Sequence, residues 1–490
     1  MNKIIDYFSP KHVQVETNFR TELIAGFTGF FASIFTILSV PGMIGAGDAA
    51  VWNSVFIASV IASIIGCLMM AFIAKMPLVV YPAMGTSSFF AATALLMIKE
   101  LSGNEDLPRV VQYQIGMFLV LITGILFSVL CVTGLTDKIL AGIPKNIKIA
   151  TVPAIGLFIT LLGVRLGGLV VATPGTFVTF FNPRNVNAIA NVPAGLTGEY
   201  LDEAMAAATM AQGAARGAIV CFIGLLFLGF LHYKQVKGSF VIAIIATTVL
   251  AYATGAYRIT DFTYNVGEQF RDWANLGLFG FDTTTIWTFA SVGTVIGVML
   301  SIILALLLTN ALDAIATTFG IAKSAGLVKD DEDLEGRKYV NKGVSADAFS
   351  SIVGGLLGGA PNTTVVSGSA GVNAGGRTGL TALVVAILTG LLLVAGPFIR
   401  LIPNMAIAPA LIFVGCLMLT GLKELDFSDM TDYLPAFIAL IFVVFTFNIG
   451  VGICLALISH IILKIISGRF KEISAISVIV AILFMLQFVL

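Results

Sequence analysis

Apolar segments long enough to cross a bilayer recur along this chain of 490 residues. A membrane-spanning helix needs about 20 mostly apolar residues. Hydrophobic residues make up 58% of the chain and charged residues only 11%, whereas a soluble domain carries about 25% charged residues. A chain this apolar cannot cover itself with polar surface in water, so lipid must be its solvent. The sequence therefore predicts an all-α membrane protein.

The predicted spans total about fourteen segments. The clearest are 21–43, 53–75, 111–133, 147–164, 214–231, 239–256, 287–318, 379–400 and 404–420. Two interrupted segments, 78–98 and 361–376, are rich in Gly, Ser and Thr, and 346–359 is a further short run. The stretch from 434 to 466 fits either two short spans, 434–447 and 448–466, or one broken span. A last apolar segment covers 473–490, and its crossing of the membrane is left open.

The distribution of Lys and Arg predicts the orientation, because cytoplasmic loops carry an excess of positive charge. With the spans above, the basic loops fall on the same side as the N-terminus, so residues 1–20 are predicted to be cytoplasmic. The polar stretches 165–213 and 257–286 then lie outside. The basic residues are Lys3, Lys11, Arg20, Lys138, Lys145, Lys148, Lys234, Lys237, Lys329, Arg337, Lys338 and Lys342, with Lys464, Arg469 and Lys471 near the end.

A weak internal repeat divides the chain. Residues 143–150 lead into a span with Pro153-Ala154, and residues 402–408 lead into a span with Pro409-Ala410. The interrupted segments hold comparable places in the two halves. Seven spans per half is an odd number, so the halves are predicted to be inverted, which is typical of transporters with a site at the midplane. The predicted parts are 21–256 and 287–466 as repeats, 257–286 as an external loop and 467–490 as a C-terminal apolar segment.

The first interrupted segment contains Pro82 and Gly85, followed by Thr86, Ser87 and Ser88. Proline lacks a backbone N–H, and glycine tolerates unusual dihedral angles. A short extended piece should give way to a helix at about Thr86, whose free N–H groups would lie at membrane depth. Such backbone is tolerated only when it is buried or lines a cavity. The alternative is a proline kink packed against neighbouring helices.

The second interrupted segment repeats this pattern. Pro361 is followed by a β-branched stretch, by glycines and by a new helix. Two facing half-helices would supply N–H donors and hydroxyls to a neutral or partly anionic ligand. The alternative is a glycine-rich close contact between helices.

Asp313 is the clearest ionisable residue well inside a predicted span. An intramembrane carboxylate is costly and indicates a functional site. It could carry a proton, bind sodium or contact a substrate, and Asn310 shares its helix face. The alternative is that Asp313 orders the inner end of the helix. Arg377 is interpreted as an anchor or gate at the cytoplasmic boundary, and Asp347 as an N-cap.

Several other function classes are not supported by the residues. The formal net charge is +0, so no global field indicates a nucleic-acid partner. Five scattered cysteines suggest neither a zinc site nor a disulfide framework, and the His residues indicate no metal site. No paired carboxylates or activated nucleophile indicate an enzyme. No cofactor is expected.

Several motifs together resemble the AzgA-like branch of nucleobase permeases, within the nucleobase–ascorbate/xanthine–uracil permease superfamily. The resemblance covers nearly the whole chain, and the Gly-Gly-Arg-Thr-Gly-Leu-Thr run is fairly specific. The motifs are Thr21-Glu22-Leu23-Ile24-Ala25-Gly26, Gly156-Leu157-Phe158-Ile159, Ala346-Asp347-Ala348, Asn362-Thr363-Thr364, Ser369-Ala370-Gly371-Val372, Gly375-Gly376-Arg377-Thr378-Gly379-Leu380-Thr381-Ala382, Ala408-Pro409-Ala410-Leu411-Ile412 and Pro435-Ala436-Phe437.

The resemblance implies two inverted repeats of seven segments, a core domain and a gate domain. The third and tenth segments would each begin as a short strand. It also implies symport of a purine across the cytoplasmic (inner) membrane by an elevator-like mechanism, coupled to protons or else sodium, and a homodimer. The expected substrate contacts are Thr86, Ser87, Asn310, Asp313, Ser367 and Gly368, with Asp313 as the coupling residue.

The sequence departs from the family's pattern at three of these positions. Ser87 replaces a usual Asn, Asn310 a carboxylate and Ser367 a Glu. Losing carboxylate acceptors should penalise purine N–H donors. The expected substrate is therefore a purine or purine-like compound, with oxidised or acidic purines among the candidates. The alternative function is a small-anion transporter or channel of the same architecture, because helix N-termini with little nearby negative charge could hold an anion.

Overall fold

The computed structural model describes most of the chain. The described ranges are 2–10, 15–134, 143–172, 178–192, 199–236, 238–257, 265–328, 334–399, 401–446 and 449–489. Four of the basic residues used to predict the orientation lie outside this description, as do the side chains of two more. The four are Lys11, Lys138, Lys237 and Lys329, and the two are Lys3 and Arg337.

The chain folds into two compact units. The first contains Met1–Phe158, Asn265–Gly396 and Met418–Leu490, and the second contains Ile159–Tyr264 and Pro397–Leu417. All six predicted substrate contacts belong to the first unit. The predicted repeats were defined by the order of segments along the chain and not by compactness. Their boundaries therefore stay predictions.

Within the described ranges, seven helical segments are long and apolar enough to cross a membrane, or up to eight if a bent pair counts as one span. The bent pair consists of α16 (Gly379–Gly390) and α17 (Leu392–Ile399), which meet at 52°. The seven are α2 with α3 (Phe19–Gly45), α4 with η1 (Ala49–Ala74), α7 (Arg109–Thr133), α9 (Lys145–Leu166), the apolar part of α10 (Ala207–Tyr233), α13 (Val292–Ser324) and α18 with η6 (Asn404–Glu424).

Three shorter apolar helices add to this set, and α21 (Ala475–Val489) follows them near the end of the chain. They are α11 (Ser239–Ala253), α19 (Met430–Phe445) and α20 (Ile449–Ile466). The stretch from 434 to 466 is therefore two separate helices rather than one broken span.

A two-stranded antiparallel sheet joins the two interrupted segments. Strand β1 (Val80–Pro82) pairs with β4 (Asn362–Thr364), with Tyr81 opposite Thr363. Backbone hydrogen bonds extend the ladder at both ends, from Ala83 N–H to the Pro361 carbonyl (2.9 Å) and from Val365 N–H to the Val79 carbonyl (3.0 Å). All six strand residues are buried. Because unpaired backbone is costly away from water, each broken segment satisfies the other.

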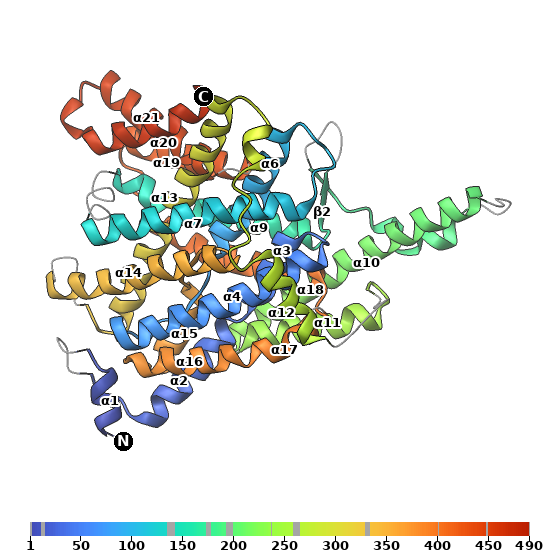
Figure 1. The fold of residues 1–490 in the computed structure, drawn as a ribbon, viewed down its shortest axis with the longest axis horizontal. Helices are drawn as coiled ribbons and strands as arrows, with labels where there is room; N and C mark the ends of the chain where they lie inside the picture. The colour runs from blue at the N-terminus through green and yellow to red at the C-terminus, as the bar shows by residue number, and fades with distance from the viewer. Residues whose placement is uncertain are drawn as a thin grey trace. The chain divides into compact units, whose positions relative to one another are not determined.

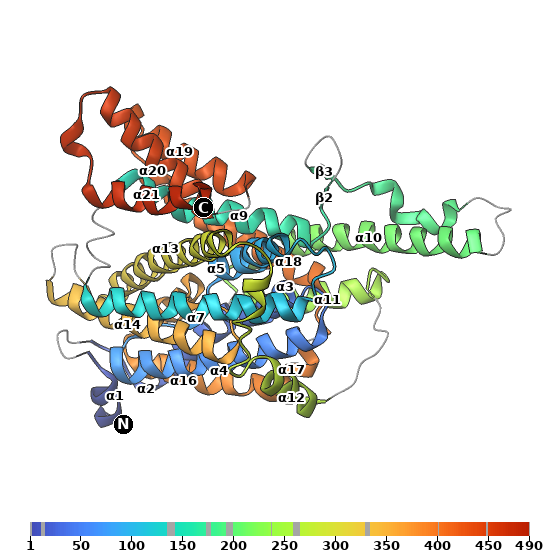
Figure 2. The same cartoon turned by 45° about the horizontal axis from the view of Figure 1, so that its top comes forward.

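Helices α7 and α14 (Leu334–Leu357) run side by side in both views (Figures 1 and 2). Their backbones approach closely at glycines. A Cβ at Gly124 would lie 2.8 Å from the Ile352 nitrogen, and one at Gly355 would lie 2.7 Å from the Leu121 Cα. Small residues at such contacts let membrane helices gain close van der Waals packing. Glycine thus serves close helix contact here.

Two polar stretches predicted as external loops contain helices. Helix α10 begins at Glu199, and its polar first part is rich in alanine, which favours helix without an apolar surface. Helix α12 (Val266–Leu276) packs on α4. Asn53 donates to Asp272 (2.7 Å), and the Trp273 indole donates to the Leu357 carbonyl (2.9 Å).

The second unit combines α10, α11 and α18 with a hairpin of β2 (Val170–Ala172) and β3 (Val178–Phe180) and the 3₁₀ segment η3 (Pro183–Asn191). One apolar cluster joins its parts: Leu169, Phe181, Ala215, Ala218, Cys221, Ala408 and Ile412. Because these residues come from both chain segments of the unit, the cluster ties α18 to the hairpin and to α10.

Candidate functional site

The first half-helix follows β1 directly. Helix α5 (Met84–Phe89) continues through the π-helical turn η2 (Phe90–Ala94) into α6 (Leu95–Ser102). Ala83 is extended (ψ 119°), so the helix starts two residues before the predicted Thr86. The extended-then-helical form of this segment is confirmed. A π-helical turn inside an α-helix is frequently found at functional sites.

The second half-helix follows β4 in the same way. A 3₁₀ turn, η5 (Val366–Gly368), leads into the short helix α15 (Ser369–Asn373). Helix α13 packs against α5, α15 and β4. One long membrane helix therefore borders both broken segments and the sheet between them, as inverted-repeat transporters arrange a midplane site.

Four buried polar atoms around these elements have no hydrogen-bond partner among the described residues. They are Ser87 Oγ and Ser88 Oγ on α5, Asn310 Oδ1 on α13 and Asn362 Oδ1 on β4. Each of these residues is at most 1% exposed. An unsatisfied buried polar group costs about 1–3 kcal/mol. Such a group in a native protein calls for an explanation, and a functional role is one.

Asn310 also takes part in a relay of hydrogen bonds. Its Nδ2 donates to Ser351 Oγ (3.1 Å), and Ser351 donates to the Asn362 carbonyl (2.7 Å). The Asn362 amide donates in turn to Ser350 Oγ (3.2 Å). This relay fixes the Asn310 and Asn362 amides through their nitrogens and leaves both Oδ1 atoms for another partner.

Asp347 is a functional candidate that the sequence reasoning missed. It lies inside α14 and is completely buried, so the predicted role as an N-cap is wrong. Its carboxylate accepts from the hydroxyls of Thr364 (3.1 Å), Thr318 (3.3 Å) and Thr363 (3.4 Å). Asp347 thereby ties β4 to α13 and α14. The signal in the sequence was the shared helix face of Asp347 with Ser350 and Ser351, three and four residues on.

Asp313 lies well inside α13, eleven residues before its last residue, Ser324, so it does not cap the helix end. It is partly exposed, and its carboxylate accepts from the Thr317 hydroxyl one turn later (3.2 Å). Asn310 is fully buried beside Ser351, whereas Asp313 remains partly open. The two share a helix but differ in surroundings.

The other predicted contacts lie on the broken segments. Thr86 is buried, and its hydroxyl donates to the Ala83 carbonyl (3.3 Å). Ser367 is half-buried and donates to Ser33 Oγ (3.0 Å). Gly368 is buried, with its N–H bonded to the Val365 carbonyl (2.9 Å). Arg377 donates to the Val372 and Gly376 carbonyls, so its guanidinium closes the end of α15.

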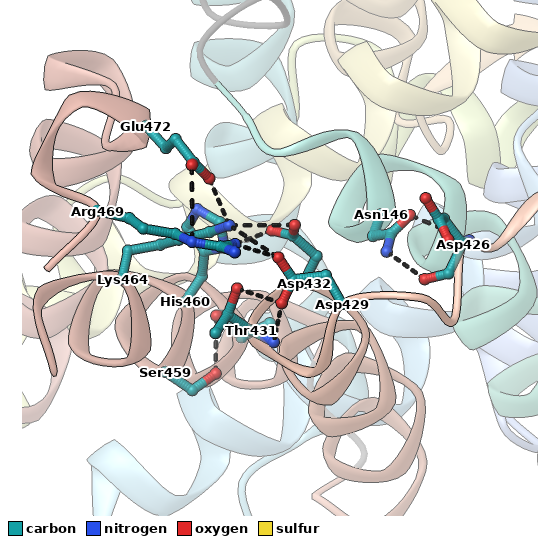
Figure 3. Close-up of polar contacts among 11 residues, drawn as sticks. Asn146, Asp426, Asp429, Thr431, Asp432, Ser459, His460, Lys464, Arg469 and Glu472 are labelled. Atoms are coloured by element: carbon teal, nitrogen blue, oxygen red, sulfur yellow. Dashed lines mark hydrogen bonds and ion pairs between the residues drawn. The ribbon is translucent and has the colours of Figure 1, made fainter. Parts of the chain in front are cut away.

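A separate ionic cluster links the ends of α19 and α20 to the turn η7 (Phe470–Glu472) (Figure 3). Lys464 is 1% exposed and pairs with Asp432 (3.1 Å) and Glu472 (2.6 Å). Arg469 pairs with Asp429, the N-cap of α19. Bonds from Thr431 and Arg469 hold the pKa of Asp429 well below its usual range. The cluster fastens a helix hairpin and shares no residue with the site described above.

Among the residues that the structure describes, no three His, Cys, Asp or Glu side chains are grouped so that they could hold a metal ion.

Comparisons with known proteins agree with this geometry. A family model described as Permease family (Xan_ur_permease) matches residues 20–196 and 196–455. The chain is 30% identical to the guanine/hypoxanthine permease PbuO of Bacillus subtilis over 96% of this chain and 98% of that protein. It is 28% identical to the adenine permease AdeP of Escherichia coli over 96% of this chain and 93% of that protein.

The transmembrane domain of a cyanobacterial bicarbonate transporter, BicA, has the same fold. The TM-score is 0.60 at 16% identity, over 90% of this chain and 99% of that one. At this identity the likeness shows the fold alone. The predicted fold class, a helical membrane protein of this transporter type with short strands in the two interrupted segments, is confirmed.

Proposed function

Because the chain belongs to the Permease family, a family of multi-pass membrane proteins, we propose that it is a secondary transporter of a purine or purine-like nucleobase. The relatives are named as permeases and not as enzymes. We place the transporter in the cytoplasmic membrane with its N-terminus inside the cell, as the basic loops predict. A homodimer, as the family resemblance implies, belongs to the same proposal.

The observation that carries the proposal is the group of buried polar atoms around α5, β4 and α13 that have no hydrogen-bond partner in the described part of the chain. A purine presents ring nitrogens and N–H groups around a planar edge. Serine hydroxyls can donate or accept, whereas an amide oxygen accepts only. Ser87 and Ser88 would serve the acceptors of the base, and the Oδ1 atoms of Asn310 and Asn362 its N–H groups. Binding would then recover the cost of burying these atoms.

The substitutions at Ser87, Asn310 and Ser367 refine the proposed substrate. A carboxylate accepts strongly from N–H groups, whereas hydroxyl and amide groups tolerate an electron-rich edge. We therefore expect an oxidised or acidic purine to bind at least as well as guanine or hypoxanthine. Ser367 and Gly368 would approach this ligand from the second broken segment, and Thr86 from the first.

Asp313 is the proposed coupling residue. It is a partly open carboxylate inside a membrane helix, and it accepts a hydrogen bond from the neutral Thr317 hydroxyl. A carboxylate inside the membrane usually needs a positively charged partner, but one that takes up a proton in each transport cycle does not. We propose proton symport, with sodium as the competing ion, and an elevator-like movement of a core domain against a gate domain.

A small-anion transporter is the second candidate, because the fold is shared with a bicarbonate transporter. That likeness is confined to the fold, whereas the relatives that match over nearly the whole chain are named for purines. The sequence similarity therefore favours a nucleobase.

A thermal-shift screen of the purified protein tests the proposal, because a ligand that binds the native state raises its apparent melting temperature. The panel contains adenine, guanine, hypoxanthine, uric acid, uracil, bicarbonate and chloride. We expect selective shifts with purines, followed by uptake of the radiolabelled ligand into vesicles. Shifts with bicarbonate or chloride and none with any purine would contradict the proposal.

The variant Ser87→Ala links binding to the site. We expect about a fivefold rise in Kd, the equivalent of about 1 kcal/mol for one hydrogen bond. Ser128→Ala is the matched control, since its Oγ is also buried and without a partner among the described residues. On α7, Gly116 packs on Phe90, near the proposed site. Ser128 lies 12 residues later on the same helix, about 18 Å away from that contact. Equal effects of the two variants would remove Ser87 from the site.

A further inference from the structure

Helix α2 (Phe19–Ser33) packs on α15 and α16 and is tied to the second broken segment at both ends. At one end, Ser367 donates to Ser33 Oγ (3.0 Å). At the other end, the Glu22 carboxylate reaches the turn between α15 and α16. Glu22 and Ser33, 11 positions apart on α2, thus bracket the short helix α15, which directly follows Ser367 and Gly368.

Glu22 is completely buried, although it is a carboxylate near the start of a membrane helix. Its Oε1 accepts from the Arg377 N–H (2.9 Å), and its Oε2 accepts from the Thr378 N–H (3.4 Å) and the Thr381 hydroxyl. The Thr17 hydroxyl also donates to Oε1 (2.8 Å). Three of the four donors thus come from the first turn of α16 or directly precede it. The positive end of the helix dipole stabilises a carboxylate there.

Helix α15 and the turn after it are too short to hold a defined orientation without contacts to other elements. Helix α15 has five residues, and isolated helices shorter than about 12 residues are marginal in water. The turn after it contains Gly375 at φ +104°, a conformation that side chains rarely adopt. Helix α15 is therefore oriented by contacts with its neighbours.

The contact with α2 leaves little space for adjustment. A Cβ at Gly371 on α15 would lie 2.8 Å from the Ala25 carbonyl oxygen, and one at Gly376 would lie 3.0 Å from Ala25 Cβ. Moving α15 and its turn against α2 would break these contacts together with the bonds to Glu22. Such an interface has one well-defined arrangement because packed protein interiors deform little.

We propose that Glu22 is a positioning residue for substrate binding. Its carboxylate holds the exit of α15 and thereby sets the place of Ser367 and Gly368, which it does not touch. The inference rests on the proposed function, because it assumes that Ser367 contacts the nucleobase. Glu22 itself contacts no substrate.

The test measures the Kd of radiolabelled adenine, guanine, hypoxanthine and uric acid for the purified protein. In Glu22→Gln one acceptor oxygen becomes an N–H₂ group that opposes the donors of the α16 turn. We expect Kd to rise about tenfold. The matched control is Thr17→Val, which removes the one donor to Glu22 that lies outside the α16 turn, and its Kd should stay within about twofold of the wild type.

A double-mutant cycle separates positioning from general stability. If Glu22 acts through Ser367, Glu22→Gln should change Kd much less in a Ser367→Ala background than in the wild type. Additive effects, or a lower melting temperature with an unchanged Kd, would overturn the inference. If Glu22→Gln does not fold, Thr381→Val removes a single donor on the α16 side and should raise Kd about threefold, with the same dependence on Ser367.

The outcome for Ser367→Ala distinguishes the two proposals. If this variant weakens purine binding and Glu22→Gln and Thr381→Val do not, the positioning role is wrong and the proposed function stands. If Ser367→Ala leaves the Kd of every purine unchanged, the assignment of Ser367 fails, and the positioning role fails with it. If no purine binds the wild-type protein, the proposed function itself fails.

Discussion

At the scale of single residues, the carboxylates inside the helices of this protein differ in how many hydrogen bonds they accept. Glu22 and Asp347 each accept several hydrogen bonds, and both hold broken segments to neighbouring helices. Among the described residues, Asp313 accepts from the Thr317 hydroxyl and is partly open. Asp313, the more accessible of these carboxylates, is therefore the better candidate for the proposed coupling role.

Replacing Asp313 by Asn should abolish accumulation driven by a pH gradient, because the amide cannot take up and release a proton. Binding should persist, since the amide still offers an oxygen acceptor. The measurement is uptake of the radiolabelled purine into vesicles with and without an imposed gradient, with counterflow exchange as the control for folded protein. Full gradient-driven accumulation in this variant would show that Asp313 is not the proton carrier.

Replacing Asp347 by Asn should lower stability, because an amide nitrogen faces the threonine hydroxyls and one acceptor is lost. We expect a loss of about 1–3 kcal/mol and a lower apparent melting temperature in detergent. Asp106→Asn makes the same chemical change on an exposed turn and should leave the melting temperature unaltered. An unchanged value for Asp347→Asn would mean that the threonines find other partners.

At the scale of elements, short pieces depend on long ones. Strands β1 and β4 have three residues each and pair only with each other. The hairpin of α19 and α20 depends on Lys464, which is buried among carboxylates that are 30–52% exposed. Elements of this size gain their stability from tertiary contacts rather than from local propensity.

The variant Lys464→Met should loosen this hairpin, because Asp429, Asp432 and Glu472 would face one another without the central cation. We expect the apparent melting temperature to fall by a few degrees and purine Kd to remain unchanged. Lys423→Met, on the exposed surface of η6, serves as the control. A change in Kd without a change in melting temperature would connect the cluster to the substrate site.

At the scale of the whole molecule, the predicted orientation can be tested by labelling from outside the cell. Thr283 and Lys471 are exposed positions on predicted opposite sides of the membrane. Cys131 and Cys416, which are not buried, are first replaced by Ser. A membrane-impermeant maleimide should then label Thr283→Cys in intact cells and Lys471→Cys only after lysis. The reverse pattern would invert the topology.

The membrane class and the places of the broken segments could be predicted from the amino-acid sequence alone. In lipid, a long apolar run satisfies its backbone hydrogen bonds by forming a helix. Pro82, Pro361 and the neighbouring glycines interrupt two of these helices. The resemblance to known permeases was carried by local motifs, which need no knowledge of the fold. Asp313 was visible because one charge in an apolar run stands out by composition alone.

Which distant residues contact one another became visible in the folded chain and not before. Asp347 reads as a helix cap in the sequence, and its role depends on Thr363 and Thr364 arriving from β4. Glu22 binds residues more than 350 positions away, at Arg377 and Thr378. Contacts between residues so far apart in the sequence depend on how the long helices pack against one another. No local periodicity in the sequence encodes them. The polar atoms left without partners around α5 and α13 were likewise visible only once the rest of the hydrogen bonds were made.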